Sequence, residues 1–338
     1  MIRNYLLFPI DKNLYDRAVL NNFFDPAILF FIFGIVAGLI KSNLEIPQQI
    51  SKFLSLYLLM ALGLKGGFAL SQSGLTQDVA KGLGAAIFLA FLVPAVGYQI
   101  LKRITGPFDA AAIAATYGSV SAVTFMATVQ YLDGQKIPYS GHMSAAMAVM
   151  ESPAILLAVF WVNGIRKKIS AVPHVHTLKQ TLHESLTDGA QLLLLGAMLV
   201  GMLSGDQGKA MMAPFSVDLF KGMLAFFLLD MGLTAARNFH NLKGNSPFLI
   251  AYAILGPIAH SFIALMLAQA LGMSLGDSLL LMVLAASASY IAVPAALKLA
   301  IPEASPSLYL GLSLGLTFPL NIIFGIPFYD FMARWVIN

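Results

Sequence analysis

The sequence predicts an all-α integral membrane protein whose two halves are related. Hydrophobic residues make up 58% of the 338 residues and charged residues only 11%, whereas a soluble domain carries about 25% charged residues. The apolar residues form continuous runs and do not alternate with polar ones, which argues against a membrane β-barrel. Five landmarks of the first half return in the second half, which indicates an internal duplication.

Ten segments are long and apolar enough to cross the hydrocarbon core, which takes roughly 20 residues per helix. These segments are residues 26–41, 47–70, 82–101, 109–131, 140–163, 187–204, 213–236, 247–270, 276–299 and 305–335. A surface segment with mixed charges, residues 1–25, precedes them and lacks the pattern of a secretory signal.

A hydrophilic connection, residues 164–186, separates five segments from five, so residues 26–163 and 187–338 are the predicted repeats. The landmarks return after a shift of 163 to 169 residues: Gly63 as Gly232, Pro94 as Pro257, Ser121 as Ser289, Pro138 as Pro302 and Pro153 as Pro319. Because five is odd, the second repeat enters the membrane from the opposite side, and the repeat is inverted.

Three basic clusters set the predicted orientation: Lys102-Arg103, Arg166-Lys167-Lys168, and Arg237 with Lys243. All three fall on one side of a ten-helix arrangement, and the positive-inside rule places that side in the cytoplasm. Both termini then lie outside. The net charge of +4 therefore reports orientation and gives no reason to expect nucleic-acid binding.

Polar, helix-weakening residues stand in the middle of the fourth and ninth segments. The fourth carries Gly118, Ser119, Val120 and Ser121, and the ninth carries Ser287, Ala288, Ser289 and Tyr290, followed by Pro294. Glycine weakens a helix and proline opens one. Helix ends freed in this way offer N–H groups to an anion, and carbonyl and hydroxyl oxygens to sodium. Alternatively, the small residues serve helix packing.

Two acids, Glu151 and Asp230, fall inside predicted spans. An acid in hydrocarbon costs about 3 kcal/mol, so each is expected to face a cavity or a partner. Either acid is a candidate cation ligand, and Asp230 has Lys65 as an alternative partner. The histidines of the connection, His174, His176 and His183, match no metal-ligand spacing. They are typical of a solvated linker, and the alternative is a docking segment for a regulatory protein.

Several motifs resemble the sodium-dependent bicarbonate transporter family of cyanobacteria and other bacteria. They are LGLKGG at 62–67, YGSVSAVTF at 117–125, QKIPY at 135–139, MESPA at 150–154 and the long run at 287–329. The resemblance implies ten helices in two inverted repeats, with a core and a gate domain, and broken helices four and nine crossing at the midplane. It also implies sodium–bicarbonate symport at the bacterial plasma membrane, a homotrimer, and a PII-like cytoplasmic regulator.

Carried onto this sequence, the anion site of the family falls on Gly118, Ser119, Val120 and Ser121, facing Ser287, Ala288 and Ser289. Thr124, Glu151 and Asp230 are the candidate sodium ligands, chosen for their chemistry. The surrounding partner is membrane lipid.

Four alternatives stay open. Two are transporters: a sodium symporter for another small organic anion, and a proton antiporter that depends on an acid such as Asp230. A third is a membrane sensor that binds the anion without transporting it. An intramembrane aspartyl protease is the fourth, and it needs two facing acids in a motif that Asp230 and Glu151 lack. The chain contains no cysteine, which excludes thiol chemistry and disulfides.

Overall fold

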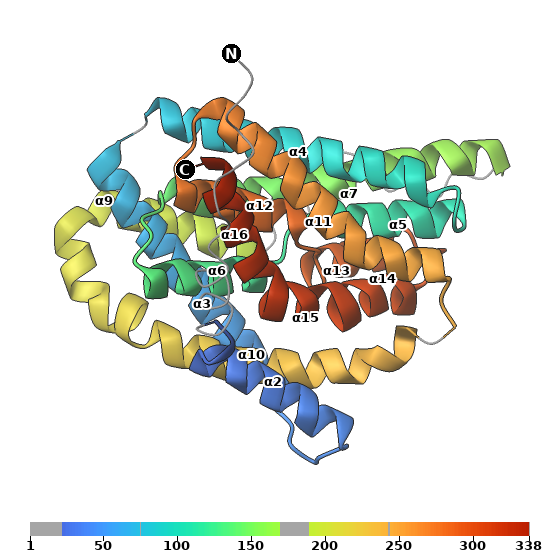
Figure 1. The fold of residues 1–338 in the computed structure, drawn as a ribbon, viewed down its shortest axis with the longest axis horizontal. Coiled ribbons are helices and arrows are strands. Elements are labelled where there is room, and N and C mark those ends of the chain that lie inside the picture. Colours follow the sequence, from blue (N-terminus) through green and yellow to red (C-terminus); the bar gives the residue numbers. More distant parts are fainter. Residues whose placement is uncertain (1–21, 75, 170–188, 243, 338) are drawn as a thin grey trace.

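The structure is a computed structural model that describes residues 22–74, 76–169, 189–242 and 244–337. Within these residues the chain is helical and forms no strand (Figure 1). Seven helical runs among them are long and apolar enough to cross a membrane, and two shorter apolar helices accompany them. The predicted all-α membrane class is therefore confirmed. The helices are α2 (Pro26–Leu39), α3 (Gln48–Ser73), α4 (Gln77–Leu101), α5 (Pro107–Gly118), α6 (Ala122–Gln135), α7 (His142–Ile169), α9 (Gly189–Ala213), α10 (Phe220–Asn238), α11 (Pro247–Leu271), α12 (Leu275–Ala286), α13 (Ala292–Ala300), α14 (Pro306–Leu312), α15 (Phe318–Leu320) and α16 (Ile326–Ile337).

Local sequence explains where several helices begin. The Asp25 carboxylate accepts a hydrogen bond from the Ala27 N–H at the start of α2. Ser246 and Ser274 accept equivalent bonds at the starts of α11 and α12. A proline stands in the first turn of α2, α5, α11 and α14, where a missing N–H loses no helical bond.

Four helices form one group, in which α2 packs along α10, α3 packs along α9, and α3 contacts α10. The close approach depends on glycine. A Cβ atom on Gly34 would lie 2.3 Å from the Leu229 carbonyl oxygen, and one on Gly67 would lie 2.1 Å from that of Met198. Small residues of this kind let membrane helices meet at the level of the backbone. We call α2, α3, α9 and α10 the four-helix group.

The larger group is formed by α4 to α7 and α11 to α16, and it covers the right and upper parts of Figure 1. The helices α5 and α12 lie at its centre. Every residue from Ala110 to Gly118 and from Gly276 to Ala286 is buried. Since α4, α7, α11 and α16 pack against these two helices, the ends of α5 and α12 are shielded from lipid.

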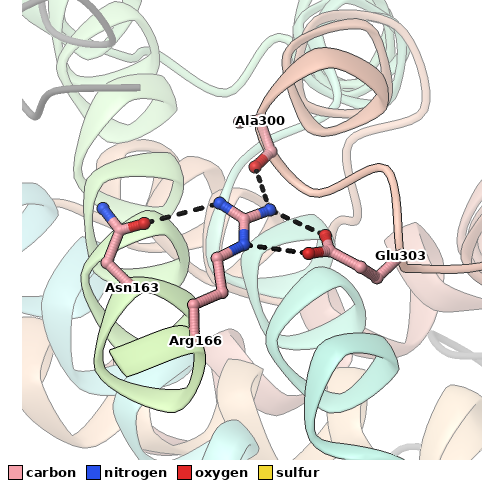
Figure 2. Close-up of polar contacts among 4 residues, drawn as sticks. All are labelled: Asn163, Arg166, Ala300 and Glu303. Carbon is pink, nitrogen blue, oxygen red and sulfur yellow. Dashed lines mark hydrogen bonds and ion pairs between the residues drawn. The ribbon is translucent and has the colours of Figure 1, made fainter. Parts of the chain in front are cut away.

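The helix of the fifth predicted segment, residues 140–163, runs further than expected, because α7 continues to Ile169. Gly164 does not end the helix, since tertiary contacts hold the following turn. The Arg166 guanidinium binds both carboxylate oxygens of Glu303 at 2.7 and 2.9 Å, and donates to the Ala300 carbonyl at 3.0 Å and to Asn163 at 3.4 Å (Figure 2). The rest of the predicted linker, with its three histidines, lies outside the described residues.

The Arg166–Glu303 pair predicts a pH-dependent contribution to stability. Hydrogen bonds from Arg166 lower the pKa of Glu303. The pair therefore stabilises the fold above the ordinary pKa of a glutamate, near 4.3, and this stability is lost as the pH falls through the lowered value. Because the Glu303 side chain is 38% exposed, the loss is at most about 1 kcal/mol. Thermal unfolding in detergent should show Glu303→Gln below the parent at pH 7, with the gap closing towards pH 3. A gap that stays constant over this range would contradict the assignment.

Candidate functional site

The fourth predicted segment is interrupted between α5 and α6. The backbone is extended at Ser119 and Ser121, which separate Gly118 from Ala122. A Cβ atom on Gly118 would lie 2.5 Å from the Pro94 ring, so this position accepts only glycine unless α4 shifts. Pro94 thus packs directly on the point where α5 ends.

The ninth segment is interrupted between Ala286 and Ala292, and Ser287 has an extended backbone. Pro294 was expected to open this helix. It is the third residue of α13, and the break at residues 287–291 includes the position one turn back, where a proline ring clashes with a helical carbonyl. The missing N–H of Pro294 itself falls among the first four of α13, which have no partner within a helix.

The two interruptions bind each other. The Ser121 N–H donates to Ser287 Oγ at 3.0 Å, and the Ser289 N–H donates to the Thr116 carbonyl at 2.8 Å. Backbone groups freed by one break are therefore satisfied by the other break. Asn321 adds to this by donating to the Ala286 carbonyl at 2.8 Å.

A small cavity of about 50 Å³ opens beside the interruptions. It is lined by Val120, Ser121, Ala122 and Val123, by Ser289, Tyr290, Ile291 and Ala292, and by Ser55, Leu59, Met147, Glu151, Ala190, Gln191 and Leu194. The first residues of α6 and of α13 thus lie on the same cavity. Ser121 and Ser289 already accept hydrogen bonds from the Thr124 and Val293 N–H groups of these helices. The partial positive charge of the two helix N-termini still favours an anion at this wall.

The lining of the cavity also includes an acid, Glu151. Glu151 of α7 accepts a hydrogen bond from the amide of Gln191 of α9. This contact joins the larger group to the four-helix group across the cavity. Sequence reasoning missed Gln191 and Ser55, although Gln191 is a polar residue within an apolar run, which is the signal that had flagged Glu151.

A wider cavity of about 710 Å³ adjoins the small one and shares Ser55 and Ile291 with it. We call it the vestibule. Its lining includes Glu45, Ser51, Lys52, Asp230, Thr234 and Arg237. Asp230 is buried and accepts a hydrogen bond from Ser51. The vestibule is therefore rich in charge at the ends of α3 and α10 that meet there.

The alternative pairing of Asp230 with Lys65 is wrong. Lys65 binds Asp133 at 2.8 Å, whereas Asp230 meets α3 at Ser51. Ser51 and Lys65 are 14 residues apart on one helix, or about 21 Å at 1.5 Å per residue. One acid cannot contact both.

The predicted anion-site residues occupy one region with different roles. Val120, Ser121 and Ser289 line the cavity, and Ser287 binds the Ser121 backbone. Ala288 is buried, and the buried Ser119 hydroxyl has no hydrogen-bond partner.

The predicted sodium ligands are divided between two places. Glu151 lines the small cavity, and the Thr124 hydroxyl donates to Ser121 Oγ at 3.0 Å. Asp230 lines the vestibule. Over the described residues no three His, Cys, Asp or Glu side chains gather as a metal cluster. A cation in the small cavity would therefore depend on one carboxylate together with hydroxyl, amide and carbonyl oxygens.

The comparisons give one match. The family model of the Na+-dependent bicarbonate transporter superfamily matches residues 26–334, a range that contains both interruptions and the vestibule. A search of curated proteins found no match.

Proposed function

Because the chain belongs to the Na+-dependent bicarbonate transporter superfamily, we propose that it imports bicarbonate together with sodium by alternating access. One observation carries this proposal: the N-terminal ends of α6 and α13 lie on the same cavity, together with Ser121, Ser289 and Glu151. The arrangement offers donors to an anion and a carboxylate to a cation within one small space.

Bicarbonate suits the serine wall of the cavity. It is a small monoanion whose oxygens accept hydrogen bonds, and hydroxyl groups and helical N–H groups are the donors that it needs. The cavity of about 50 Å³ exceeds the 10–15 Å³ that one water requires, yet it has no room for a bulky organic anion. The size of the cavity favours bicarbonate over the organic-anion alternative.

Sodium suits the Glu151 side of the same cavity. Carboxylate, hydroxyl and amide oxygens are ligands for a hard cation, and Glu151, Gln191 and Ser55 supply all three types. A bound cation neutralises Glu151, which would otherwise repel the anion at short range. Sodium therefore binds before bicarbonate. Thr124 supports Ser121, and Asp230 attracts the cation within the vestibule.

The ten-helix count has support in the lengths of the helical runs. One of the seven long runs, Gly189–Leu242, has 54 residues, or about 80 Å of helix, against a core of about 30 Å. It is interrupted at Gly205, whose φ is 56°, and has the length of two spans. With α2 and the α12–α13 pair, the number of spans is ten.

The inverted repeat has support in the contacts. If α2 corresponds to α9 and α3 to α10, the α2–α10 contact becomes the α9–α3 contact, and both are extensive. Capping contacts correspond too. Asp109 of α5 accepts from the Ser305 N–H at 2.8 Å, and Asp277 of α12 accepts from the Ser140 N–H at 2.6 Å.

We propose that the four-helix group is the gate and the larger group is the core. The vestibule contains Arg237, which belongs to the basic clusters predicted to face the cytoplasm, so the conformation is inward-open. Both termini then lie outside a bacterial plasma membrane. A homotrimer and a PII-like regulator on the cytoplasmic face are further expectations from the resemblance.

Uptake of radiolabelled bicarbonate into proteoliposomes tests the function directly. An inward sodium gradient should drive uptake, and an equal potassium gradient should not. Sodium-driven uptake of an organic anion, without uptake of bicarbonate, would show that the substrate is the organic anion. Sodium-dependent binding of bicarbonate to folded protein, without flux, would make the protein a sensor.

Replacement of the cavity serines should slow uptake and leave the fold intact. Ser121→Ala and Ser289→Ala each remove a hydroxyl from the anion wall, and a hydrogen bond to a charged group is worth about 1.5–3 kcal/mol. Each should lower the initial uptake rate about tenfold or more. Ser278→Ala is the matched control, since Ser278 is a fully buried serine of α12 outside the cavity lining. Parental rates in both cavity variants would place the anion site elsewhere.

Two acid variants separate the cavity from the vestibule. Glu151→Gln removes the cavity carboxylate, so the sodium concentration for half-maximal uptake should rise at least tenfold. Asp230→Asn removes the vestibule acid and should raise this half-maximal sodium concentration by less. Gln191→Glu adds a second carboxylate beside Glu151 and should alter the sodium dependence more than the bicarbonate dependence. A larger effect at Asp230 than at Glu151 would reverse the assignment.

A further inference from the structure

An ion pair joins the two groups of helices on the side away from the vestibule. Lys65 of α3 binds Asp133 of α6 at 2.8 Å. Their surroundings extend the contact. Tyr139 Oη donates to the other Asp133 oxygen at 3.2 Å, and the Lys65 ammonium lies 5.2 Å from the ring centroid of Phe220 on α10. Burial and the nearby Asp133 raise the pKa of Tyr139, so its hydroxyl stays protonated and able to donate.

The two ends of α3 differ in what they face. At one end Ser51 and Ser55 line the vestibule, a space of about 710 Å³ between α3, α10 and the second interruption. Lys65 lies ten residues beyond Ser55, about 15 Å along the helix, and is bound across the groups. The vestibule thus lies at one end of α3, and at the other end the ion pair joins the two groups beside a smaller cavity of about 380 Å³ between α2, α10 and α6.

The repeat has no equivalent of this tie at the vestibule end. The landmark that maps Gly63 onto Gly232 maps Lys65 onto Thr234, which lines the vestibule. Landmarks on either side of Asp133 map it into residues 297–301, whose one charged member is Lys298. A threonine and a lysine form no ion pair, so the attraction can act only at the outer end.

We propose that the Lys65–Asp133 pair is a latch that closes the outer side of the protein and favours the inward-open state. The inference rests on the proposed alternating access. The two side chains are 21% and 34% exposed, so water reaches them and the pair is weak enough to break in each cycle. The missing counterpart at Thr234 makes the energy of the two end states unequal.

The test uses the absence of native cysteine. Val123→Cys places a reporter in the small cavity, ten residues before Asp133 on α6, and Ser55→Cys places one where the cavity meets the vestibule. A membrane-impermeant thiol reagent is applied to right-side-out and to inverted membrane vesicles. In the parent, both cysteines should react chiefly from the vestibule side. Asp133→Asn and Lys65→Met should each raise reaction of the Val123→Cys reporter from the latch side about fivefold, the population shift expected for loss of a partly exposed ion pair.

A double-mutant cycle tests that the two residues act as one contact. The Lys65→Met/Asp133→Asn variant should react no faster than either single variant, because the same interaction is already lost. Asp78→Asn is the matched control, since the ion pair of Asp78 with Lys81 lies within α4 and does not connect the two groups of helices. Continued labelling of Ser55→Cys from the vestibule side shows that a variant is folded.

Two results would overturn the latch: unchanged latch-side labelling in folded single variants, or additive increases in the double variant. The readout needs no substrate, so it stands apart from the uptake assays. Loss of sodium-driven uptake with the labelling pattern intact would refute the proposed cargo and keep the latch.

Discussion

The need to satisfy backbone polar groups away from water governs the rest of this structure. Each interrupted helix leaves carbonyl and N–H groups without helical partners at a depth where water is scarce, and each orphan costs several kcal/mol. The chain answers by pairing the breaks: Ser121 with Ser287, and Ser289 with Thr116. One break could not be tolerated without the other. The burial of α5 and α12 follows from the same need, because lipid tails supply no hydrogen-bond donor for a free carbonyl.

This pairing also explains the composition of the neighbouring helices. Asn321 is buried in the last helical run, donates to the Ala286 carbonyl, and accepts from the Tyr329 hydroxyl at 2.8 Å. Tyr117 and Thr317 share a second buried hydrogen bond at 2.6 Å, and Thr317 donates onward to the Ala253 carbonyl. These polar residues sit inside apolar segments because they complete a network that a hydrophobic side chain would leave unsatisfied.

Hydropathy predicted the membrane class and apolar segments that begin at residues 26 and 247, where α2 and α11 begin. The caps Asp25 and Ser246 and the first-turn prolines, all local features, explain these starts. The predicted internal duplication pointed to the polar residues of both breaks, because they stand at corresponding positions in the two halves of the sequence. The contacts between residues far apart in the chain could not be predicted from these patterns. Nothing near Lys65 in the chain distinguishes Asp133 from Asp230, and the extension of α7 depends on Glu303, 137 residues from Arg166. Gln191 reaches the cavity only because α9 packs along α3, a contact between the two predicted repeats.

The size of the small cavity has a consequence for selectivity. A space of about 50 Å³, where one water needs 10–15 Å³, holds only a few water molecules, fewer than the full hydration shell of an ion. An ion at the proposed site would exchange most of its bound water for polar groups of the lining, such as serine hydroxyls and the carboxylate of Glu151. The cost of that dehydration rises steeply with charge, so a dianion such as sulfate would be rejected for the strength of its hydration before its shape mattered. At the proposed site, discrimination would then depend on the water that an ion gives up, and a monoanion would be favoured because its dehydration costs less than that of a dianion.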